Sequence, residues 1–524
     1  MMRRWLVGLS IIYWAITLPW FSTVPFNWDA AQFNIALHHY DVNLHQPHPP
    51  GYPLFIVLGK LFGVVLPDNI ALTLVAALFG WVSVIMLYLL CYQLSKKNLT
   101  AGLISLAWMV NPLFWLNREV ALTYTVDAAA SITLGYLVFL TMTKRDRQYL
   151  IFGALTLGLA GAFRPSLLLL LLPLFIYQAS FHRRNWKLLL ITSGIIIGLT
   201  LLWFIPVVWL TGGLNNYLEL SRKLYGSAAA DTAWTWNQIK FVGSTLLLSL
   251  NLVLVGLGWA VYKIIRGQRS WILFGLAWVC PAWLIYGLIH FGQVGYALVL
   301  LPPAYLLLVP LVQRRLSLAG VIIVLNLSIF LLLSPVYAQT NFFPHTRAQV
   351  YLQKLARYAP ELFKWNYLAL QNQSTYLLEV QKLAQHYPAD QTLVVTTRNL
   401  QYPSPANGLL LRNKDAFREI SYILPDYQVV EVSPGRDYAL KSFNYVMSSS
   451  DHSKLTVANN IRYVIIVTDA FPSEDIPQSI ITQPIPVPHT DHFVQLGIMD
   501  KPWQFANIAF AREADILGLH DTTR

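Results

Sequence analysis

Long apolar segments fill the first two thirds of this chain and decide its predicted class. Runs of 18 or more mostly apolar residues are typical of membrane-spanning helices. Such segments lie at 5–24, 69–95, 98–116, 120–143, 187–210, 239–263, 271–290, 294–312 and 316–337. The stretch 149–180 is too long for one span and is interrupted at Arg164-Pro165, so it predicts two short helices, 149–163 and 166–180. The pattern therefore predicts about eleven transmembrane helices.

Two apolar regions need a separate interpretation. Residues 47–66 are dense in proline and glycine, which disfavours a regular spanning helix, so we interpret them as a re-entrant or interfacial segment. The N-terminal residues 1–4 precede an apolar run, as in a signal peptide, but no small-residue cleavage site follows. We therefore expect a retained first helix.

Charged residues alternate between the loops. Of the 21 basic residues before residue 338, 15 lie in loops that this count places in the cytoplasm, whereas Asp146 alone of the eight acidic residues does. An excess of Lys and Arg in cytoplasmic loops sets the orientation of membrane proteins. We therefore expect a multi-pass protein of the bacterial inner membrane with a cytoplasmic N-terminus. Its long outer loops lie at about 25–68 and 211–238.

The pattern changes after residue 337, where hydropathy drops. Residues 345–390 predict helices, and buried-strand patterns occur at 392–396, 427–432 and 463–467, with a helical segment at 415–424. Helices that alternate with buried strands predict a small α/β domain with a partly parallel sheet. The predicted fold is thus an α-helical polytopic membrane domain over 1–337, followed by a soluble extracytoplasmic α/β domain over 338–524.

Composition narrows the function classes. The chain is 56% hydrophobic and only 12% charged, with a net charge of +12. The positive excess lies in the membrane half, where anionic lipid headgroups favour it, and residues from 338 onward are nearly neutral. We expect membrane lipid and no nucleic acid among the partners, because no basic face lies outside the membrane loops. Both cysteines, Cys91 and Cys280, lie inside predicted helices, so no disulfide is expected.

The first outer loop offers the first candidate for chemistry. Asp29 follows the first predicted span, and a partly desolvated carboxylate there is a suitable general base for a hydroxyl group. The alternative is that Asp29 caps a helix over 30–38. His48 lies in a proline-rich turn (His45–Leu54), where it is either a phosphate ligand or a solvated surface side chain.

Further candidates lie near the outer ends of predicted helices. Asp127 lies within a predicted span, with Tyr124 one turn before it and Glu119 in the preceding outer turn. An ionisable residue inside a span suggests a functional site; the alternative is a structural polar contact between helices. Arg164 closes the turn between two short helices, where it would pair with a phosphate or with Asp127. Arg222 and Lys223 lie in the second long outer loop.

These residues together resemble the GT-C membrane glycosyltransferases. The resemblance covers about residues 1–340, and the nearest families are the protein O-mannosyltransferase-like family (glycosyltransferase family 39) and the lipid A aminoarabinose transferase. It rests on an Asp after the first span, a double proline ending the first outer loop, an Asp in the helix after the third outer turn and a soluble C-terminal domain. Two departures are Ala30, where the mannosyltransferases have Glu, and His48, where the aminoarabinose transferase has Lys.

The resemblance implies an inverting transfer from a polyprenyl-phosphate sugar to a lipid, glycan or protein acceptor. It implies Asp29 as the catalytic carboxylate, with Asp127 as a second acidic residue of the same site. His48, Arg164, Arg222, Lys223, Glu119 and Tyr124 would bind donor phosphate or substrate. It assigns no cofactor with certainty and leaves open a divalent cation, Mg²⁺ or Mn²⁺. The alternatives are a transporter or flippase for a lipid-linked sugar and a non-catalytic scaffold.

Overall fold

The computed structural model describes residues 1–231, 236–254, 269–286, 292–333, 347–359, 361–397, 417–432, 454–467, 483–486, 493–498, 503–505 and 508–512. The chain divides into two units. Unit 1 comprises Met1–Ser22 and Phe33–Ala369, and unit 2 comprises Thr23–Gln32 and Leu370–Arg524. The boundary predicted at 337/338 falls within 334–346, outside the described residues, and stays a prediction.

Unit 1 is helical, and its helices follow the predicted apolar segments. The α-helices that lie wholly within it are α1 Met2–Thr17, α3 Pro53–Gly63, α4 Asp68–Ser95, α5 Asn98–Met109, α6 Pro112–Arg118, α7 Tyr124–Lys144, α8 Arg147–Phe163, α9 Ser166–Ser180, α10 Trp186–Leu210, α11 Leu214–Asp231, α12 Trp236–Leu250, α14 Arg269–Leu284, α15 Leu301–Leu306, α16 Val309–Arg314, α17 Leu316–Leu332, α18 Arg347–Tyr358 and α19 Glu361–Lys364. Short 3₁₀ helices are η1 Leu18–Trp20, η2 Val42–Leu44 and η4 Val294–Val299. Two helices bridge the units: α2 Trp28–His38 and α20 Tyr367–Ala384.

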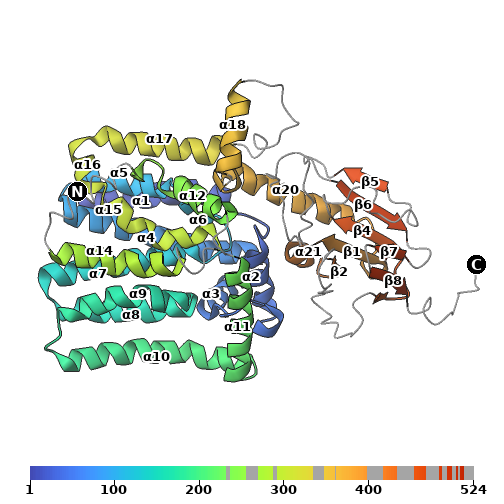
Figure 1. Cartoon of the computed structure of the whole chain (residues 1–524), viewed down its shortest axis with the longest axis horizontal. Helices are drawn as coiled ribbons and strands as arrows, with labels where there is room; N and C mark the ends of the chain where they lie inside the picture. The colour runs from blue at the N-terminus through green and yellow to red at the C-terminus, as the bar shows by residue number, and fades with distance from the viewer. Residues whose placement is uncertain are drawn as a thin grey trace, which may run out of the picture. The chain divides into compact units, whose positions relative to one another are not determined.

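The long helices of unit 1 lie side by side. Figure 1 shows α7, α8, α9, α10 and α14 in a roughly parallel array, with α11 running across one end of α10. α4 and α7 pack together along their length, and both bury most of their side chains.

Eleven full spans are not confirmed. Among the described residues, α4, α7 and α10 are long and apolar enough to cross a membrane, and α5 with α6 forms a fourth candidate that is bent by 67°. Five further apolar helices are shorter, at 10–17 residues. The predicted span 294–312 is divided into η4, α15 and α16, with prolines at the first turns of α15 and α16, because proline cannot donate the backbone hydrogen bond that continues a helix.

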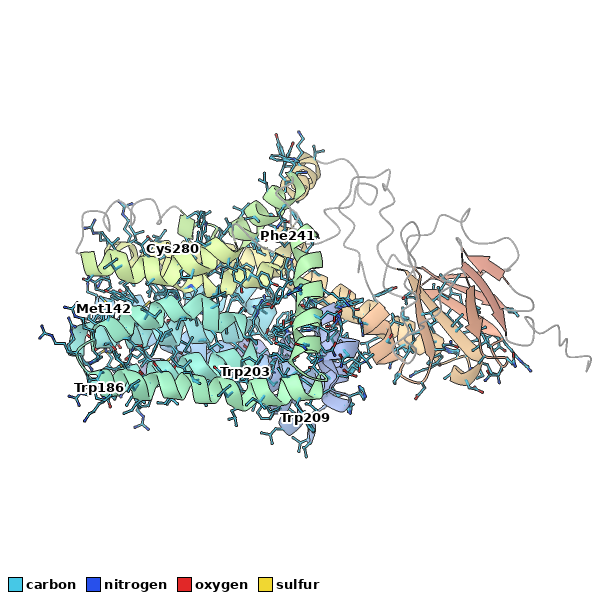
Figure 2. All side chains as sticks on the ribbon, turned by 60° about the horizontal axis from the view of Figure 1, so that its bottom comes forward. Met142, Trp186, Trp203, Trp209, Phe241 and Cys280 are labelled. Carbon is cyan, nitrogen blue, oxygen red and sulfur yellow. The ribbon has the colours of Figure 1, made fainter. Side chains whose placement is uncertain are left out.

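α10 shows how a span of this unit meets lipid. It is about 37 Å long at about 1.5 Å per residue, enough for a hydrocarbon core of roughly 30 Å. Trp186 and Trp209, near its two ends, are exposed, whereas Trp203 is buried against the neighbouring helices (Figure 2). Tryptophans at both ends of an apolar helix are typical of the two membrane–water interfaces.

Unit 2 contains two β-sheets and the helices α20 and α21 (Phe417–Ile423). The strands are β1 Thr392–Thr397, β2 Gln428–Val432, β3 Lys454–Val457, β4 Tyr463–Val467, β5 Gln483–Pro486, β6 Phe493–Ile498, β7 Trp503–Phe505 and β8 Ile508–Arg512. The larger sheet has the order β2-β1-β4-β6-β5, with β1 parallel to β2 and β4, and β6 antiparallel to its neighbours. The smaller sheet has the order β3-β8-β7. The partly parallel sheet and its three predicted strands are thus confirmed.

The apolar core of unit 2 uses residues from both ends of the chain. Leu377 and Val380 of α20 and Ile420 of α21 pack against buried valines and isoleucines of β1, β2, β4 and β6. Val24 is buried in the same cluster, and Trp28 packs against it. The segment 23–32, which follows the first apolar helix in sequence, therefore belongs to the hydrophobic core of the C-terminal unit.

Candidate functional site

A buried ion pair in unit 1 joins two of the predicted site residues. Asp127 lies in the first turn of α7, and Arg164 ends α8 directly before Pro165. A residue before proline favours extended backbone, and Arg164 has φ −152° and ψ 103°. Its Nη1 donates a hydrogen bond to Asp127 Oδ2. The side chain of Asp127 is fully buried and that of Arg164 is 7% exposed. Arg164 was predicted to pair with a phosphate or with Asp127, and the structure shows the ion pair with Asp127.

Tyrosine rings surround the Arg164 guanidinium. Its carbon lies 4.9 Å from the centre of the Tyr124 ring and 4.6 Å from that of Tyr296, and such contacts stabilise a buried cation. Tyr286 stacks on Tyr296 with ring centres 4.5 Å apart. Arg164 thus lies beside a group of three tyrosine rings.

Hydrogen bonds from α7 hold the elements that supply these rings. Ser131, one turn after Asp127, donates to the Val299 carbonyl of η4 at 2.9 Å. The Trp278 indole of α14 donates to the Ser131 hydroxyl at 2.7 Å. Gly295 leaves room for Tyr124, since a Cβ atom there would lie 2.3 Å from its ring. The position of Tyr296 is therefore fixed by bonds and by close packing.

Each partner of the ion pair has hydrogen-bonding atoms that the pair itself does not use. Asp127 Oδ1 is buried and has no hydrogen-bond partner among the residues that the structure describes. The bond to Asp127 engages Nη1 of Arg164, and a guanidinium has five N–H donors. Arg164 can therefore hold Asp127 and an anionic oxygen at the same time, as arginine commonly does with phosphate.

The loop that carries His48 packs beside the turn that carries Arg164. Val42 and Leu54 from this loop share an apolar cluster with Ala162 of α8, Leu168 of α9 and Trp203 of α10. Gly51 has φ +100° and a Cβ there would lie 2.5 Å from the Tyr40 hydroxyl, which donates to the Gly51 carbonyl at 2.9 Å.

His48 is partly buried and does not behave as a freely solvated side chain. Its Nε2 lies 2.8 Å from the Tyr52 hydroxyl, and its ring centre lies 5.9 Å from that of Phe33. The peptide bonds Gln46-Pro47 and Pro49-Pro50 on either side of it are cis. A role of His48 in phosphate binding stays a prediction.

Glu119 forms a buried ion pair with its neighbour Arg118. Arg118 Nε donates to Glu119 Oε1 at 3.1 Å, and both side chains are fully buried. The guanidinium carbon lies 4.8 Å from the centre of the Tyr13 ring and 5.0 Å from that of Trp115. The Glu119 carbonyl accepts from the Ser22 N–H at 2.9 Å. These contacts make Glu119 part of the packing between α1 and α6, and its predicted contact with substrate stays a prediction.

Arg222 and Lys223 lie on α11 and are exposed. Lys223 Nζ lies 2.7 Å from Glu219 Oε1, one turn earlier on the same helix. Exposed pairs of this spacing contribute little to stability. The structure thus places these cations on the surface of α11, outside the buried Asp127–Arg164 pair, and their predicted contact with donor phosphate stays a prediction.

Asp29 lies in the first turn of α2, in unit 2. The helix begins at Trp28, two residues before the start predicted for it, and the Asn27 side chain accepts from the Ala30 N–H at 3.0 Å. Asn27 therefore caps α2, and the interpretation of Asp29 as the cap was wrong. Asp29 is partly exposed, and a carboxylate in a first turn is favoured by the helix dipole.

Sequence reasoning missed Tyr286 and Tyr296. A phenol within an apolar segment was the available signal, because tyrosine hydroxyl groups need a polar partner when buried. Periodicity alone could not assign them to Arg164, which lies more than 100 residues away in the chain. Among the described residues, no group of three or more His, Cys, Asp or Glu side chains could hold a metal ion.

Residues 37–189 match the family described as protein O-mannosyl-transferase TMEM260 N-terminal domain. This segment contains His48, Asp127 and Arg164. The protein O-mannosyl-transferase tmem260 of Dictyostelium discoideum is 34% identical over 95 residues, which are 17% of this chain and 11% of that protein. The chain thus spans about a tenth of that relative.

Two solved structures share the fold over nearly the whole chain. Both are ArnT from Cupriavidus metallidurans, one bound to undecaprenyl phosphate and one in the apo state, each with a TM-score of 0.59 and 11% sequence identity. Each alignment covers 94% of this chain and 97% of ArnT. The chain has the fold of the GT-C membrane glycosyltransferases, and its residues 37–189 are similar to the TMEM260 O-mannosyl-transferase domain.

Proposed function

We propose that this chain is a membrane glycosyltransferase that moves a sugar from a polyprenyl-phosphate donor to a hydroxyl group of a lipid, glycan or protein acceptor on the outer face of the membrane. The observation that carries the proposal is the match of residues 37–189 to an O-mannosyl-transferase domain. The GT-C fold over almost the whole chain supports it. The hexose or pentose class of the sugar stays open.

The donor phosphate is proposed to bind at Arg164. The guanidinium is buried, anchored by Asp127 and surrounded by tyrosine rings. A preorganised cation in a site that excludes water stabilises a phosphate far more than an exposed lysine does. ArnT, which shares the fold, was crystallised with undecaprenyl phosphate. His48 is the second proposed phosphate ligand, because its loop packs with the ends of the helices that hold Arg164.

The proposed reaction inverts the anomeric carbon. The Asp29 carboxylate takes the proton of the acceptor hydroxyl group. The acceptor oxygen then bonds to the anomeric carbon, while the bond from that carbon to the phosphate oxygen breaks. The electron pair leaves with polyprenyl phosphate, whose charge is held by Arg164 and His48. No general acid is needed, because phosphate is a good leaving group.

The decisive test is Asp29→Asn in purified protein. Asn has the same size, and Asn27 continues to cap the helix. We expect transfer to fall by about 10²–10⁴, the usual contribution of general base catalysis. Transfer is measured as release of undecaprenyl phosphate from undecaprenyl-phosphate-linked hexoses and pentoses, with a membrane extract as the source of acceptors.

The control separates the base from the cap. Asn27→Ala removes the capping side chain and should lower stability by about 1 kcal/mol, while folded Asn27→Ala protein still transfers sugar. If Asp29→Asn releases undecaprenyl phosphate at a near-normal rate, Asp29 is not the base. If wild-type protein instead carries the intact donor across a vesicle membrane without releasing undecaprenyl phosphate, the chain is a flippase.

A further inference from the structure

The first outer segment is built into the C-terminal unit. Val24 is 5% exposed and lies in one apolar cluster with residues of α20, α21 and four strands of the larger sheet. Trp28 packs against the same cluster. Burial of an aromatic ring and a valine orders the backbone between them. Residues 23–32 are thus held by residues that lie more than 340 positions later in the chain.

Arg418 provides a polar anchor for the same segment. Arg418 and Glu419 lie in the first turn of α21 and are 6% and 3% exposed. The guanidinium carbon of Arg418 lies 5.0 Å from the centre of the Trp28 ring. A desolvated cation over a tryptophan is the strongest form of this contact. A buried arginine is costly unless it makes such contacts, and an uncharged side chain at this position would lose the contact with the Trp28 ring.

Trp28 is the first residue of α2 and Asp29 is the second. Asn27 closes the other side of this turn through its hydrogen bond to Ala30. The backbone position of Asp29 is therefore tied to the neighbouring Trp28 ring, which packs against the core cluster and is covered by Arg418. A displacement of about 1 Å in a catalytic group can cost about a hundredfold in rate.

We propose that Arg418 is a positioning residue, which acts through Trp28 to orient Asp29, and that the C-terminal unit is thereby a working part of the transferase. The proposal rests on the proposed function of Asp29 as general base. It assigns a role to the α/β unit that neither the membrane helices nor the sheet topology indicates.

The test is a double-mutant cycle in full-length protein. Arg418→Met keeps most of the apolar stem and removes the charge, and Trp28→Leu removes the ring. We expect each change to lower kcat by about tenfold to a hundredfold, with KM for the undecaprenyl-phosphate sugar within about twofold, since Arg164 is untouched. The double variant should lose little more than either single variant, because both remove the same contact.

Hydrogen–deuterium exchange provides a readout that does not depend on activity. Loss of a contact of this kind corresponds to about a fivefold change in a local opening equilibrium. Peptides that cover residues 23–34 should therefore exchange about five times faster in Arg418→Met, with the rest of unit 2 unchanged. Trp28→Phe keeps an aromatic ring, so it should retain most of the protection from exchange and most of the kcat that Trp28→Leu loses.

Arg462→Met is the matched control, because Arg462 is an exposed arginine of the same unit; it should change neither exchange nor kcat. Unchanged exchange at 23–34 and unchanged kcat in Arg418→Met would overturn the proposal. Asp29→Asn is measured in the same preparation. If that variant is inactive and Arg418→Met is normal, the positioning role alone fails; if Asp29→Asn transfers normally, the proposed function of Asp29 fails whatever Arg418 does.

Discussion

Asp127 and Arg164 form an ion pair in the buried interior of unit 1. Both side chains are nearly or fully buried, and within the described part of the chain only one oxygen of Asp127 has a hydrogen-bond partner. Removal of one member of such a pair leaves an uncompensated buried charge. The same arrangement permits two explanations, a structural pair and a phosphate site, and these predict different results.

A double-mutant cycle separates these explanations. Asp127→Asn and Arg164→Met should each destabilise unit 1 by about 3–5 kcal/mol, seen as a lower unfolding midpoint in detergent. The double variant should regain much of that stability, because no isolated charge remains. Undecaprenyl phosphate should raise the midpoint of wild-type protein and of Asp127→Asn, but not that of either Arg164→Met protein. An undiminished shift in the double variant would mean that Arg164 does not bind the phosphate.

At this scale, the sequence indicated the partners but not their surroundings. Ionisable residues in apolar segments need partners, so Asp127 and Arg164 were natural candidates for each other. The cap of α2 was misassigned because Asn27 and Asp29 are both good capping residues, two positions apart. The rings of Tyr286 and Tyr296 come from distant segments, and hydrophobic patterns contain no information on which ring meets which cation.

Among the elements, the bend between α5 and α6 is held by one side chain. Asn111 Oδ1 accepts from the Phe114 N–H and so caps α6. Its Nδ2 donates to the Ser249 carbonyl at 2.6 Å and to the Tyr305 hydroxyl at 3.0 Å. This polar cluster continues through Asn326, which donates to the Ala107 carbonyl at 3.0 Å. Residues of α12, α15 and α17 therefore supply hydrogen-bond partners for the polar groups at the bend.

Substitution of Asn111 should distinguish its two tasks. Asn111→Asp retains the cap but has no amide donor, whereas Asn111→Ala loses both. We expect Asn111→Ala to lower stability by about 2–4 kcal/mol, from a lost cap and buried groups without partners, and Asn111→Asp to cost at least as much because it buries a charge. Unfolding midpoints in detergent check this. Equal stability of all three proteins would show that the bend does not depend on Asn111.

The 3₁₀ helix η4 should tolerate no side chain at Gly295. A Cβ atom there would lie 2.3 Å from the Tyr124 ring, which contacts Arg164. Gly295→Ala must displace that ring, at a cost of about 1–3 kcal/mol, and should weaken the shift caused by undecaprenyl phosphate. Gly320→Ala on α17, where nothing lies within 4 Å, is the control and should behave as wild type. A wild-type shift in Gly295→Ala would exclude Tyr124 from the phosphate site.

The helical segments were easier to predict than the points at which they are interrupted or bent. The segments 69–95, 120–143 and 187–210 correspond closely to α4, α7 and α10. Hydropathy averages over a window, so it merged η4, α15 and α16 into one span and did not show the 67° bend between α5 and α6. In unit 2 the buried strands β1, β2 and β4 were predicted, whereas the edge strand β5, with two prolines in four residues, has no recognisable strand pattern.

For the whole molecule, the predicted orientation in the membrane rests on the distribution of charge. An alkaline phosphatase fused after residue 340 should be active and one fused after residue 183 inactive, because alkaline phosphatase folds only outside the cytoplasm. A green fluorescent protein at the same positions should give the opposite pattern. Activity of the phosphatase after 183 would reverse the predicted topology. The location in a bacterial inner membrane stays a prediction. A protein that is similar to 95 residues of this chain is from the eukaryote Dictyostelium discoideum.

The first outer segment is synthesised long before the residues that form its core in unit 2. Val24 and Trp28 leave the ribosome about 350 residues before α20, the first element that covers them. At about 5–20 residues per second, this segment waits roughly 20 to 70 s for the first of its partners, while the helices of unit 1 are inserted. Until then its apolar side chains have no partner in the core cluster, so the C-terminal helices and strands, which are made last, decide when the first loop becomes ordered. A truncated chain that stops before α20 would leave that loop permanently without its core.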